Sequence, residues 1–426
     1  MSKAKQKGKH TPGVHKRSSH PVLVPSNPEI TWIIEPHDPL IVRDGRPFGP
    51  NPSARAISLS FPFPSTTTGG VRSRAGLKSD GTFNLSQIER VKKIKVRGPL
   101  LVQLSQSGEH IEKWLVPAPA DALLLEWGKK DHVWRKPLIP LTVYQGAEFN
   151  STHDGTALML VGPVRPNLRK PSIEAPPYWH WNAFEQWLLD PAEGEQSLAV
   201  LGHRGPLHEH RLHVSMNPET LTAKTGALFE TSGLEFVSPG EDLETRLRNA
   251  QRLALAVIVD RKEAATLRSG LASLGGERRM VTWRSGDRNP PDCPPKLRKQ
   301  IAKDRACRVV LLTPACFKAG YRPTWLLEPR EGVEPTLQAI AIQHPQVVSG
   351  WDLEHGRPKP TRRLAPAGTV FFLSLKGEGE AIEKWVKGLW MHCISDDVED
   401  RNDGFGMAVF GSWLGEPQVM EEVKEQ

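Results

Sequence analysis

The 426-residue sequence predicts an α+β fold. Short segments rich in β-branched and aromatic residues, which favour strands, alternate with amphipathic segments that favour helices. This mixture occurs in two successive blocks, the second starting near residue 228, without the strict strand–helix alternation of a parallel sheet. The length is sufficient for two or three domains that each bury a core.

The first block begins with a strand over 29–36, EITWIIEP, and a shorter one over 40–43. Ser65 is the expected N-cap of a helix that contains Val71 and Arg72. Arginines beside such a helix start would reinforce the affinity of its free amide groups for phosphate. Further strands are expected at 100–104 and 123–127, and a helix at 181–189 within a loop-rich stretch over 128–195.

The second block contains more strands than helices. A helix expected over 261–274 ends at the pair Gly275–Gly276, because glycine readily adopts the left-handed conformation that ends helices. The other elements that we expect are strands at 233–237, 253–259, 279–283, 308–313, 346–350 and 369–375, and helices at 296–303 and 380–391.

The net charge of +8 is unevenly distributed along the chain. Residues 1–28 form a basic tail whose first 20 residues include six Lys or Arg and no acid, a composition that predicts disorder. Residues 278–308 contain ten Lys or Arg against three Asp, and such a cluster attracts a polyanion. A solvated helix and loop face is the alternative reading of that cluster. Residues 416–426 form an acidic tail.

Several protein classes are disfavoured because their patterns are missing from the sequence. It has no run of 18 or more apolar residues and no apolar core in its basic N-terminus, so we expect a cytoplasmic protein with no membrane contact. The four cysteines lack zinc-like spacing, and neither a P-loop nor a GxGxxG pattern is present, since Val409 stands where its last glycine would be. We therefore expect no metal and no cofactor.

Three motifs could carry phosphate or acid–base chemistry, and local chemistry leaves each of them open. The stretch RDGR (43–46) is either a solvated turn or a phosphate-binding turn, because arginine can bind phosphate through two N–H groups. The glycine-rich stretch GFG (404–406) is either a plain turn or a loop whose amide groups reach phosphate. On a strand, His208 and His210 would share one face, which suits a metal, an acid–base pair or phosphate.

Six stretches occur in order along the chain: IEPHDPLIVRDGRPF, FPFPSTTTGGVRSRAG, GGERR, LLTPACFKAG, SGWDLEHGRPKPTRRLAPAGTVFF and GFGMAVFGSW. Together they resemble the Cmr-type RAMP proteins, the family of the third-named subunit of type III-B CRISPR effector complexes. The resemblance runs from about residue 30 to residue 413. It implies two tandem ferredoxin-like (RRM-like) domains, 29–235 and 236–415, with a cleft between them, a Gly-rich loop near the C-terminus and an insertion around 128–195.

The resemblance also implies a function. Members of this family cap the repeat-derived 5′ handle of the guide RNA (crRNA) in a heteromeric complex, beside the large polymerase-like subunit and the adjacent backbone RAMP subunit. We therefore expect a noncatalytic RNA-binding subunit. The alternative is a metal-independent endoribonuclease that cuts CRISPR repeat RNA with histidine as general acid or base, for which His37, His208 and His210 are the candidates.

The RNA-binding residues implied by the resemblance lie in these motifs and in the histidine-rich stretch. Arginine would hold phosphate, glycine would admit the RNA backbone, and Phe405 would either stack on a base or lie in the core. The full set is Arg43, Asp44, Gly45, Arg46, Ser65, Thr66, Arg72, His208, Arg211, Gly275, Gly276, Arg278, Arg279, Thr313, Gly404, Phe405 and Gly406.

Overall fold

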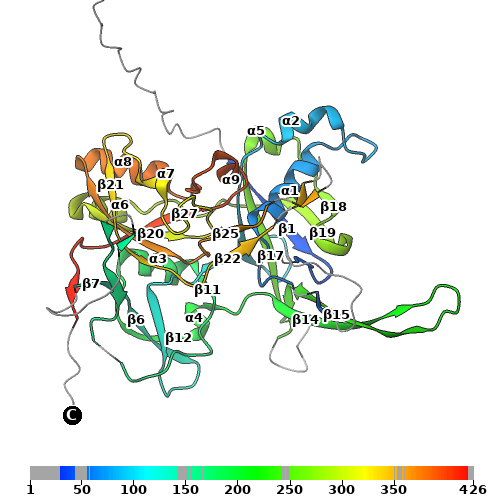
Figure 1. Ribbon diagram of the computed structural model, residues 1–426, viewed down its shortest axis with the longest axis horizontal. Helices are drawn as coiled ribbons and strands as arrows, with labels where there is room; N and C mark the ends of the chain where they lie inside the picture. Colours follow the sequence, from blue (N-terminus) through cyan, green and yellow to red (C-terminus); the bar gives the residue numbers. More distant parts are fainter. Residues whose placement is uncertain are drawn as a thin grey trace, which may run out of the picture.

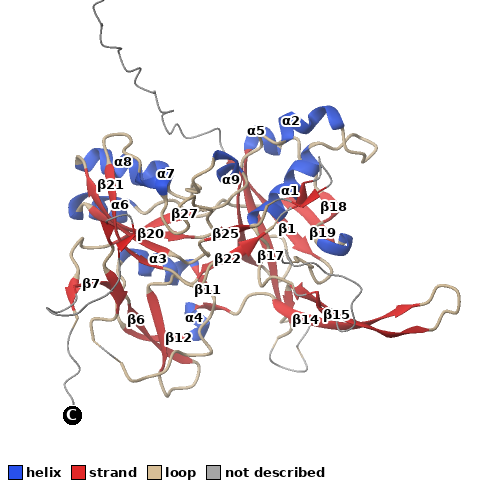
Figure 2. Ribbon diagram, viewed as in Figure 1, coloured by secondary structure: helices blue, strands red, loops and turns tan. Residues whose placement is uncertain are grey.

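The computed structural model describes residues 29–43, 55–56, 58–142, 152–153, 156–165, 167–240, 245, 249–349, 351–352, 357–358 and 360–420. Two antiparallel sheets form the centre of the molecule, with helices packed on them and further small sheets around them (Figure 1, Figure 2). This is the mixed α and β architecture that the sequence predicts.

The larger sheet has β1 in its interior, paired antiparallel with β17 on one side and β19 on the other. The predicted strand 29–36 is confirmed, and its central residues Trp32, Ile33 and Ile34 are buried on both faces of the sheet. The strand order is β13 (Gly202–His203), β11 (Tyr178–His180), β4 (Ile111–Pro117), β3 (Val96–Leu104), β17 (Gln251–Asp260), β1 (Glu29–Pro36), β19 (Met280–Ser285) and β18 (Gly270–Ser273), and β16 (Val237–Ser238) also pairs with β17.

Strands from both sides of the expected domain boundary at 235/236 share this sheet. The strands β17, β18 and β19 follow that boundary in the chain, yet they pair with each other and with β1 and β3 from the N-terminal block. Among the described residues, the chain therefore changes from the larger to the smaller sheet only after β19. Local sequence patterns do not reveal this, because they carry no information on which distant strand is the partner.

The smaller sheet is formed by residues after 305, in the strand order β21 (Glu334–Ala341), β26 (Val370–Lys376), β20 (Ala306–Leu311) and β27 (Ala408–Ser412). Along the chain its elements follow the order β20, α7 (Thr324–Leu327), β21, β26, α8 (Gly379–Leu389) and β27. The helix α8 turns Ile382, Trp385 and Leu389 toward the core, at the spacing of one helical face. The helix α6 (Pro295–Asp304), which precedes β20, packs beside it.

Two hydrophobic cores lie on opposite faces of the larger sheet. On one face Leu100 and Val102 share a core with Phe371 of the smaller sheet and with Trp187 of α3 (Trp181–Leu189), so this core joins the two sheets. On the other face Trp32 packs under α1 (Pro64–Ala75) and against β19. Since both faces are covered, alternate residues of β1 and β3 enter different cores.

The stretch over 128–195 is more regular than expected. The predicted helix at 181–189 is confirmed as α3, but strands occupy much of the rest. One small sheet contains β5 (Ala122–Glu126), β6 (His132–Pro137) and β12 (Gly194–Ser197), and another contains β7 (Ile139–Thr142), β10 (Leu160–Gly162) and β28 (Gln418–Val419). The tryptophans of this stretch lie within regular elements: Trp134 in β6, Trp179 in β11, and Trp181 and Trp187 in α3.

Two predicted elements were wrong. Residues 40–43 form isolated bridges from Leu40 and Arg43, not a strand, because each pairs with a different segment. The helix expected over 261–274 is only α5 (Arg261–Ala264), and residues 270–273 form the edge strand β18. Gly270 adopts a φ of +123°, which no right-handed helix accommodates, and the backbone of 270–273 bonds to β19 instead.

A long hairpin, β14 (Leu207–Met216) and β15 (Ala223–Glu235), leaves the body of the molecule on the right in Figure 1. Its base is fixed to the body, since Leu40 bridges Leu234 and β2 (Arg55–Ala56) pairs with β15. No helix among the described residues is long and apolar enough to cross a membrane.

Candidate nucleic-acid interface

The helix α1 begins at Pro64, so its N-cap is Phe63 and the prediction of Ser65 as N-cap was wrong. Proline is well suited to the first helical position, because its ring fixes φ near the helical value. Ser65 and Thr66 instead lie in the first turn, half-buried, and the amide of Thr66 donates to the carbonyl oxygen of Phe63 at 3.0 Å.

Arg72, in the same helix, is held by the protein itself. Its Nη1 lies 2.6 Å from Asp403 Oδ1, and its Nη2 donates to the carbonyl oxygen of Ile94 at 3.0 Å. One turn earlier, Thr68 Oγ1 donates to the carbonyl oxygen of Asp403 at 2.7 Å. These contacts tie α1 to the loop that follows α9 (Val398–Asn402) and use the guanidinium that was expected to hold phosphate.

The glycines of the GFG stretch are required by close packing. Gly404 and Gly406 have φ of +96° and +83°, which favours glycine. A Cβ on Gly404 would lie 2.6 Å from the carbonyl oxygen of Gly98 in β3, and one on Gly406 would lie 2.8 Å from the amide nitrogen of Ser395. The close approach is therefore between protein backbones.

Thr313 completes this contact. Its buried hydroxyl donates to the carbonyl oxygen of Gly404 at 2.7 Å and accepts from the amide of Met407 at 2.8 Å. We call this region the α1 junction: α1, Thr313 and residues 403–407. It joins an N-terminal helix to the loop before β27, so three separate sequence motifs meet there.

Phe405 lies in the hydrophobic core of the α1 junction, as one of its two expected roles predicts. Its side chain has no exposed surface and packs with Phe63, Val348 and Leu364. The guanidinium of Arg362 lies 5.6 Å from the ring centroid and forms an ion pair with Asp400. The ring is thus covered by protein on the side where a base would have to stack.

The GGE motif forms a tight turn against the segment after β1. Gly275 has a φ of +73°, and a Cβ there would lie 2.5 Å from the carbonyl oxygen of Ile41. The amide of Gly276 donates to the same oxygen at 2.7 Å. Next come Glu277 and Arg278, with φ of +54° and +52°, values that residues with a Cβ adopt rarely and that often mark functional turns.

The arginines of this turn have different surroundings. Arg279 is largely covered, and its Nη2 lies 2.8 Å from Glu277 Oε2. Arg278 is exposed. Arg43 is also exposed, and it follows by two residues Ile41, whose carbonyl oxygen accepts from the amide of Gly276 in the turn. Asp44, Gly45 and Arg46 lie outside the described residues. The turn therefore brings Arg43 and Arg278 to one part of the surface.

His208 and Arg211 lie on β14, in the exposed hairpin. Arg211 is paired with Glu209, its Nη2 lying 2.9 Å from the carboxylate, and this contact raises the pKa of its guanidinium. The neighbouring His210 Nδ1 lies 2.8 Å from Glu230 Oε1, and its ring is 6.4 Å from that of His208. Among the described residues, no cluster of three His, Cys, Asp or Glu side chains is placed to hold a metal ion.

A large cleft of 1780 Å³ separates the ends of β3 and β17 from the smaller sheet. Charged side chains of both signs line it. Among the described residues they are seven Asp or Glu and eight Lys or Arg, which include Lys93, Lys95, Arg97 and Arg305. Arg97 is paired with Glu29, but Lys93, Lys95 and Arg305 have no carboxylate partner among the residues that the structure describes. All three are exposed, so their charges face the space of the cleft.

His392 also lines the cleft. Burial, followed by the charges of Arg97 and Lys95, lowers its pKa to about 4. Nearby, the ring of Trp325 lies between two guanidinium groups, with Arg330 Cζ 3.9 Å and Arg401 Cζ 4.4 Å from its centroid. The cleft thus contains cations beside carboxylates, and those cations that have no carboxylate partner among the described residues are the groups that could bind phosphate.

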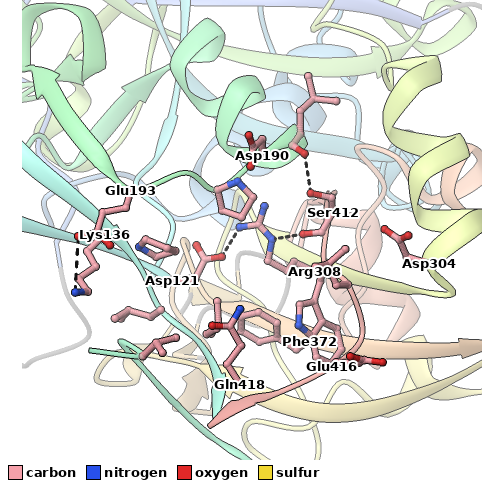
Figure 3. Close-up of a pocket in the computed structure, with 18 of the residues that line it drawn as sticks. Asp121, Lys136, Asp190, Glu193, Asp304, Arg308, Phe372, Ser412, Glu416 and Gln418 are labelled. Carbon is pink, nitrogen blue, oxygen red and sulfur yellow. Dashed lines mark hydrogen bonds and ion pairs between the residues drawn. The ribbon is translucent and has the colours of Figure 1, made fainter. Parts of the chain in front are cut away.

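The basic stretch over 278–308 does not form one surface. Arg305 enters the cleft, Arg284 donates to the carbonyl oxygen of Glu109 at 3.0 Å, and Arg308 is buried beside a separate cavity of 680 Å³ (Figure 3). Arg308 Nη1 lies 2.5 Å from Asp121 Oδ2, both side chains being at most 2% exposed. A count of charge along the sequence cannot separate such a core pair from a solvated cation.

Of the cleft cations, Arg305 lies in the basic stretch that the sequence singled out, whereas Lys93 and Lys95 were missed. Their signal was present in the stretch VKKIKVRG, where Lys93, Lys95 and Arg97 alternate along an extended segment and so share one side. The predicted set divides into the α1 junction, the Arg43–Arg278 turn and the hairpin residues His208 and Arg211, which the structure does not bring into one site.

One protein family matches most of the chain. The sequence profile described as CRISPR-associated protein (Cas_Cmr3) matches residues 32–413, whereas no curated protein matches the chain. Similar solved chains come from the type III-B Cmr-beta complex bound to cognate target RNA (16% identity, 80% of this chain and 86% of that one, TM-score 0.41) and from the same complex with target RNA and AMPPnP (15%, 80% and 86%, 0.40). A chain of the Csm3-Csm4 subcomplex of the type III-A CRISPR-Cas interference complex is also similar (10%, 82% and 94%, 0.32).

The matched range begins in β1 and ends just after β27, so it includes both central sheets and all six ordered motifs. This chain therefore belongs to the Cas_Cmr3 family of CRISPR-associated proteins and is a Cmr-type RAMP protein, as its motifs predict.

Proposed function

We propose that this protein is a noncatalytic RNA-binding subunit of a type III-B CRISPR complex that caps the 5′ handle of the crRNA and links the polymerase-like large subunit to the backbone RAMP subunits. The family assignment supports the setting. The observation that carries RNA binding is the cleft, where Lys93, Lys95 and Arg305 offer unpaired positive charge beside Trp325. RNA phosphates would displace counterions from these cations.

Under this proposal, the two sheets derive from tandem ferredoxin-like units with the cleft between them. The smaller sheet supports this for the C-terminal unit: its chain order is strand, helix, strand, strand, helix, strand, and its first and third strands are central.

The exposed arginines Arg43 and Arg278 form a second contact in this proposal. A turn with positive φ at both Glu277 and Arg278 is held in place by Ile41, so the Arg278 side chain leaves the surface in a fixed direction. Phosphate contacts of this kind position RNA without reading its bases.

The proposal is tested with purified full-length protein and two RNAs that differ only at the 5′ end: a crRNA with its repeat-derived handle and one with the handle nucleotides shuffled. Fluorescence anisotropy should give tighter binding of the intact handle. Equal affinity for both RNAs would contradict handle capping, and no binding of either would contradict the RNA-binding function itself.

Catalysis is tested separately by incubating the protein with a repeat-containing transcript in the presence of chelator. We expect the transcript to remain intact. A specific cut that disappears in the His208→Ala variant would overturn the noncatalytic assignment.

A further inference from the structure

The cavity of 680 Å³ beside Arg308 shares no lining residue with the cleft, the α1 junction or the Arg43–Arg278 turn (Figure 3). It lies between β6 and β7, the end of α3, the helix α6 and the smaller sheet. Apolar side chains, among them Leu138, Ile139 and Val164, form part of its wall. Pockets for small organic molecules enclose about 300–1,000 Å³, so the cavity has the size and the walls of such a site.

Three charged side chains of the cavity are at most 8% exposed, and two of them, Arg308 and Asp121, satisfy each other. Arg308 Nε donates to the carbonyl oxygen of Ser412 at 2.8 Å, and its Nη2 donates to that of Trp187 at 2.6 Å, while its Nη1 pairs with Asp121. The other carboxylate oxygen of Asp121 accepts from the indole N–H of Trp187 at 2.9 Å. This pair therefore does not need a ligand.

Lys136 is the third buried charge, and its hydrogen bonds are not made within the described structure. Its ion-pair partner there is Glu193, but the 3.7 Å from Nζ to Oε1 is too long for a hydrogen bond. That oxygen already accepts from the indole N–H of Trp134 at 2.7 Å. The ammonium of Lys136 has three N–H donors, and a buried donor without an acceptor is costly. The cavity thus lacks an acceptor beside Lys136.

The other charges of the cavity limit the charge of a ligand. Its lining includes five acidic and four basic side chains, and three of the acids are exposed. Figure 3 shows Asp304 and Glu416 on the far side of Arg308 from Lys136. One negative charge beside Lys136 would be compensated there, whereas the second charge of a phosphate would be repelled by the remaining carboxylates. A carboxylate with an apolar body fits this combination of charge and wall.

We propose that this cavity binds a small organic monocarboxylate. Its carboxylate accepts from Lys136 Nζ, and its apolar body packs against Leu138, Ile139 and Val164. The walls come from the stretch over 128–195 and from the smaller sheet, so the bound ligand also stabilises the contact between them. The inference goes beyond the proposed function and does not depend on RNA binding.

The test uses octanoate as the probe, with octanol, which has the same chain without the charge, and inorganic phosphate for comparison. Calorimetric titration of the full-length protein should show one site for octanoate and at least about tenfold weaker binding of the other two. Lys136→Met keeps most of the side-chain volume without the ammonium and should weaken octanoate binding by at least about tenfold. Lys129→Met is the matched control, because Lys129 is also paired with a glutamate, Glu195, but is exposed, and it should bind octanoate like wild type.

A second variant, Val164→Trp, fills the cavity and leaves Lys136 in place, so it should also prevent binding. It keeps the proposal testable if Lys136→Met does not fold. No octanoate binding by wild type, equal affinity for octanoate and octanol, or wild-type affinity in folded Lys136→Met or in Val164→Trp would each overturn the proposal. Since no RNA is present, these outcomes are independent of the proposed function.

Discussion

The α1 junction and the cleft contain similar residue types but use them in opposite ways. At the junction, Arg72 is paired with Asp403, and Gly404 is packed against β3. In the cleft, Lys93 and Lys95 are exposed and have no carboxylate partner among the described residues. The comparison teaches that arginine and glycine motifs which resemble phosphate sites in sequence can instead stabilise the fold. Whether such a residue packs against protein or is free to bind phosphate depends on its ion pairing and burial.

The largest loss of stability is expected at the buried ion pair between Arg308 and Asp121. Arg308→Ala would leave the Asp121 carboxylate buried and without its cation, which we expect to lower the free energy of unfolding by about 3–5 kcal/mol. Urea denaturation measures it. The double variant Arg308→Met/Asp121→Asn removes both charges and keeps an acceptor for the indole N–H of Trp187, so it should lose clearly less. If the double variant were as unstable as the single one, the pair would not be the cause.

The next effect concerns the glycines of the α1 junction. Gly404→Ala combines an unfavourable positive φ with contact to the carbonyl oxygen of Gly98, and we expect a loss of about 2–4 kcal/mol. Gly81 is the matched control, because its φ is +84° but nothing lies within 4 Å of its Cβ position. Gly81→Ala should cost about 1 kcal/mol by the same denaturation measurement. Equal losses would show that packing against β3 is unimportant.

A smaller effect is expected from His392 in the cleft. Its folded pKa of about 4 lies below its usual 6.5, so the unfolded state takes up the proton first as pH falls. The free energy of unfolding is therefore highest above about pH 6.5, where His392 is neutral in both states, and it decreases as the pH falls toward 4. Between pH 7 and pH 5 we expect this decrease to be about 1 kcal/mol, after allowance for the partial exposure of the ring. Urea midpoints at the two pH values should differ less in His392→Asn than in wild type. An identical difference would contradict this assignment.

Much of the secondary structure was predictable because it depends on local pattern. The strand at 29–36, which is rich in β-branched and aromatic residues, and the helix at 181–189 were predicted at their observed bounds. The edge strand β18 was not, because its residues form a strand only through pairing with β19. Most of the long hairpin was missed for a related reason: β14 has no buried residue, so it lacks the alternation of buried and exposed residues that marks a half-buried strand.

For the candidate site, the sequence predicted which residues come together better than it predicted what each of them does. The ordered motifs identified residues that do meet in space, such as Thr313 and Gly404. Their roles depend on partners more than 90 positions away in the chain, as Arg72 with Asp403 shows. Sequence patterns report which groups are available, but the desolvation and pairing that decide whether a cation is free arise only in the fold.

The salt dependence of crRNA binding tests most directly whether RNA is held by the cleft cations and not by the α1 junction. For Lys93→Ala/Lys95→Ala we expect the slope of log affinity against log salt to fall by about 0.7 per lost phosphate contact. Lys384→Ala/Lys387→Ala, which removes the same charge from exposed positions on α8, should keep the wild-type slope, as should Arg72→Gln in its folded state. A wild-type slope in the cleft variant together with a reduced slope in Arg72→Gln would contradict the account.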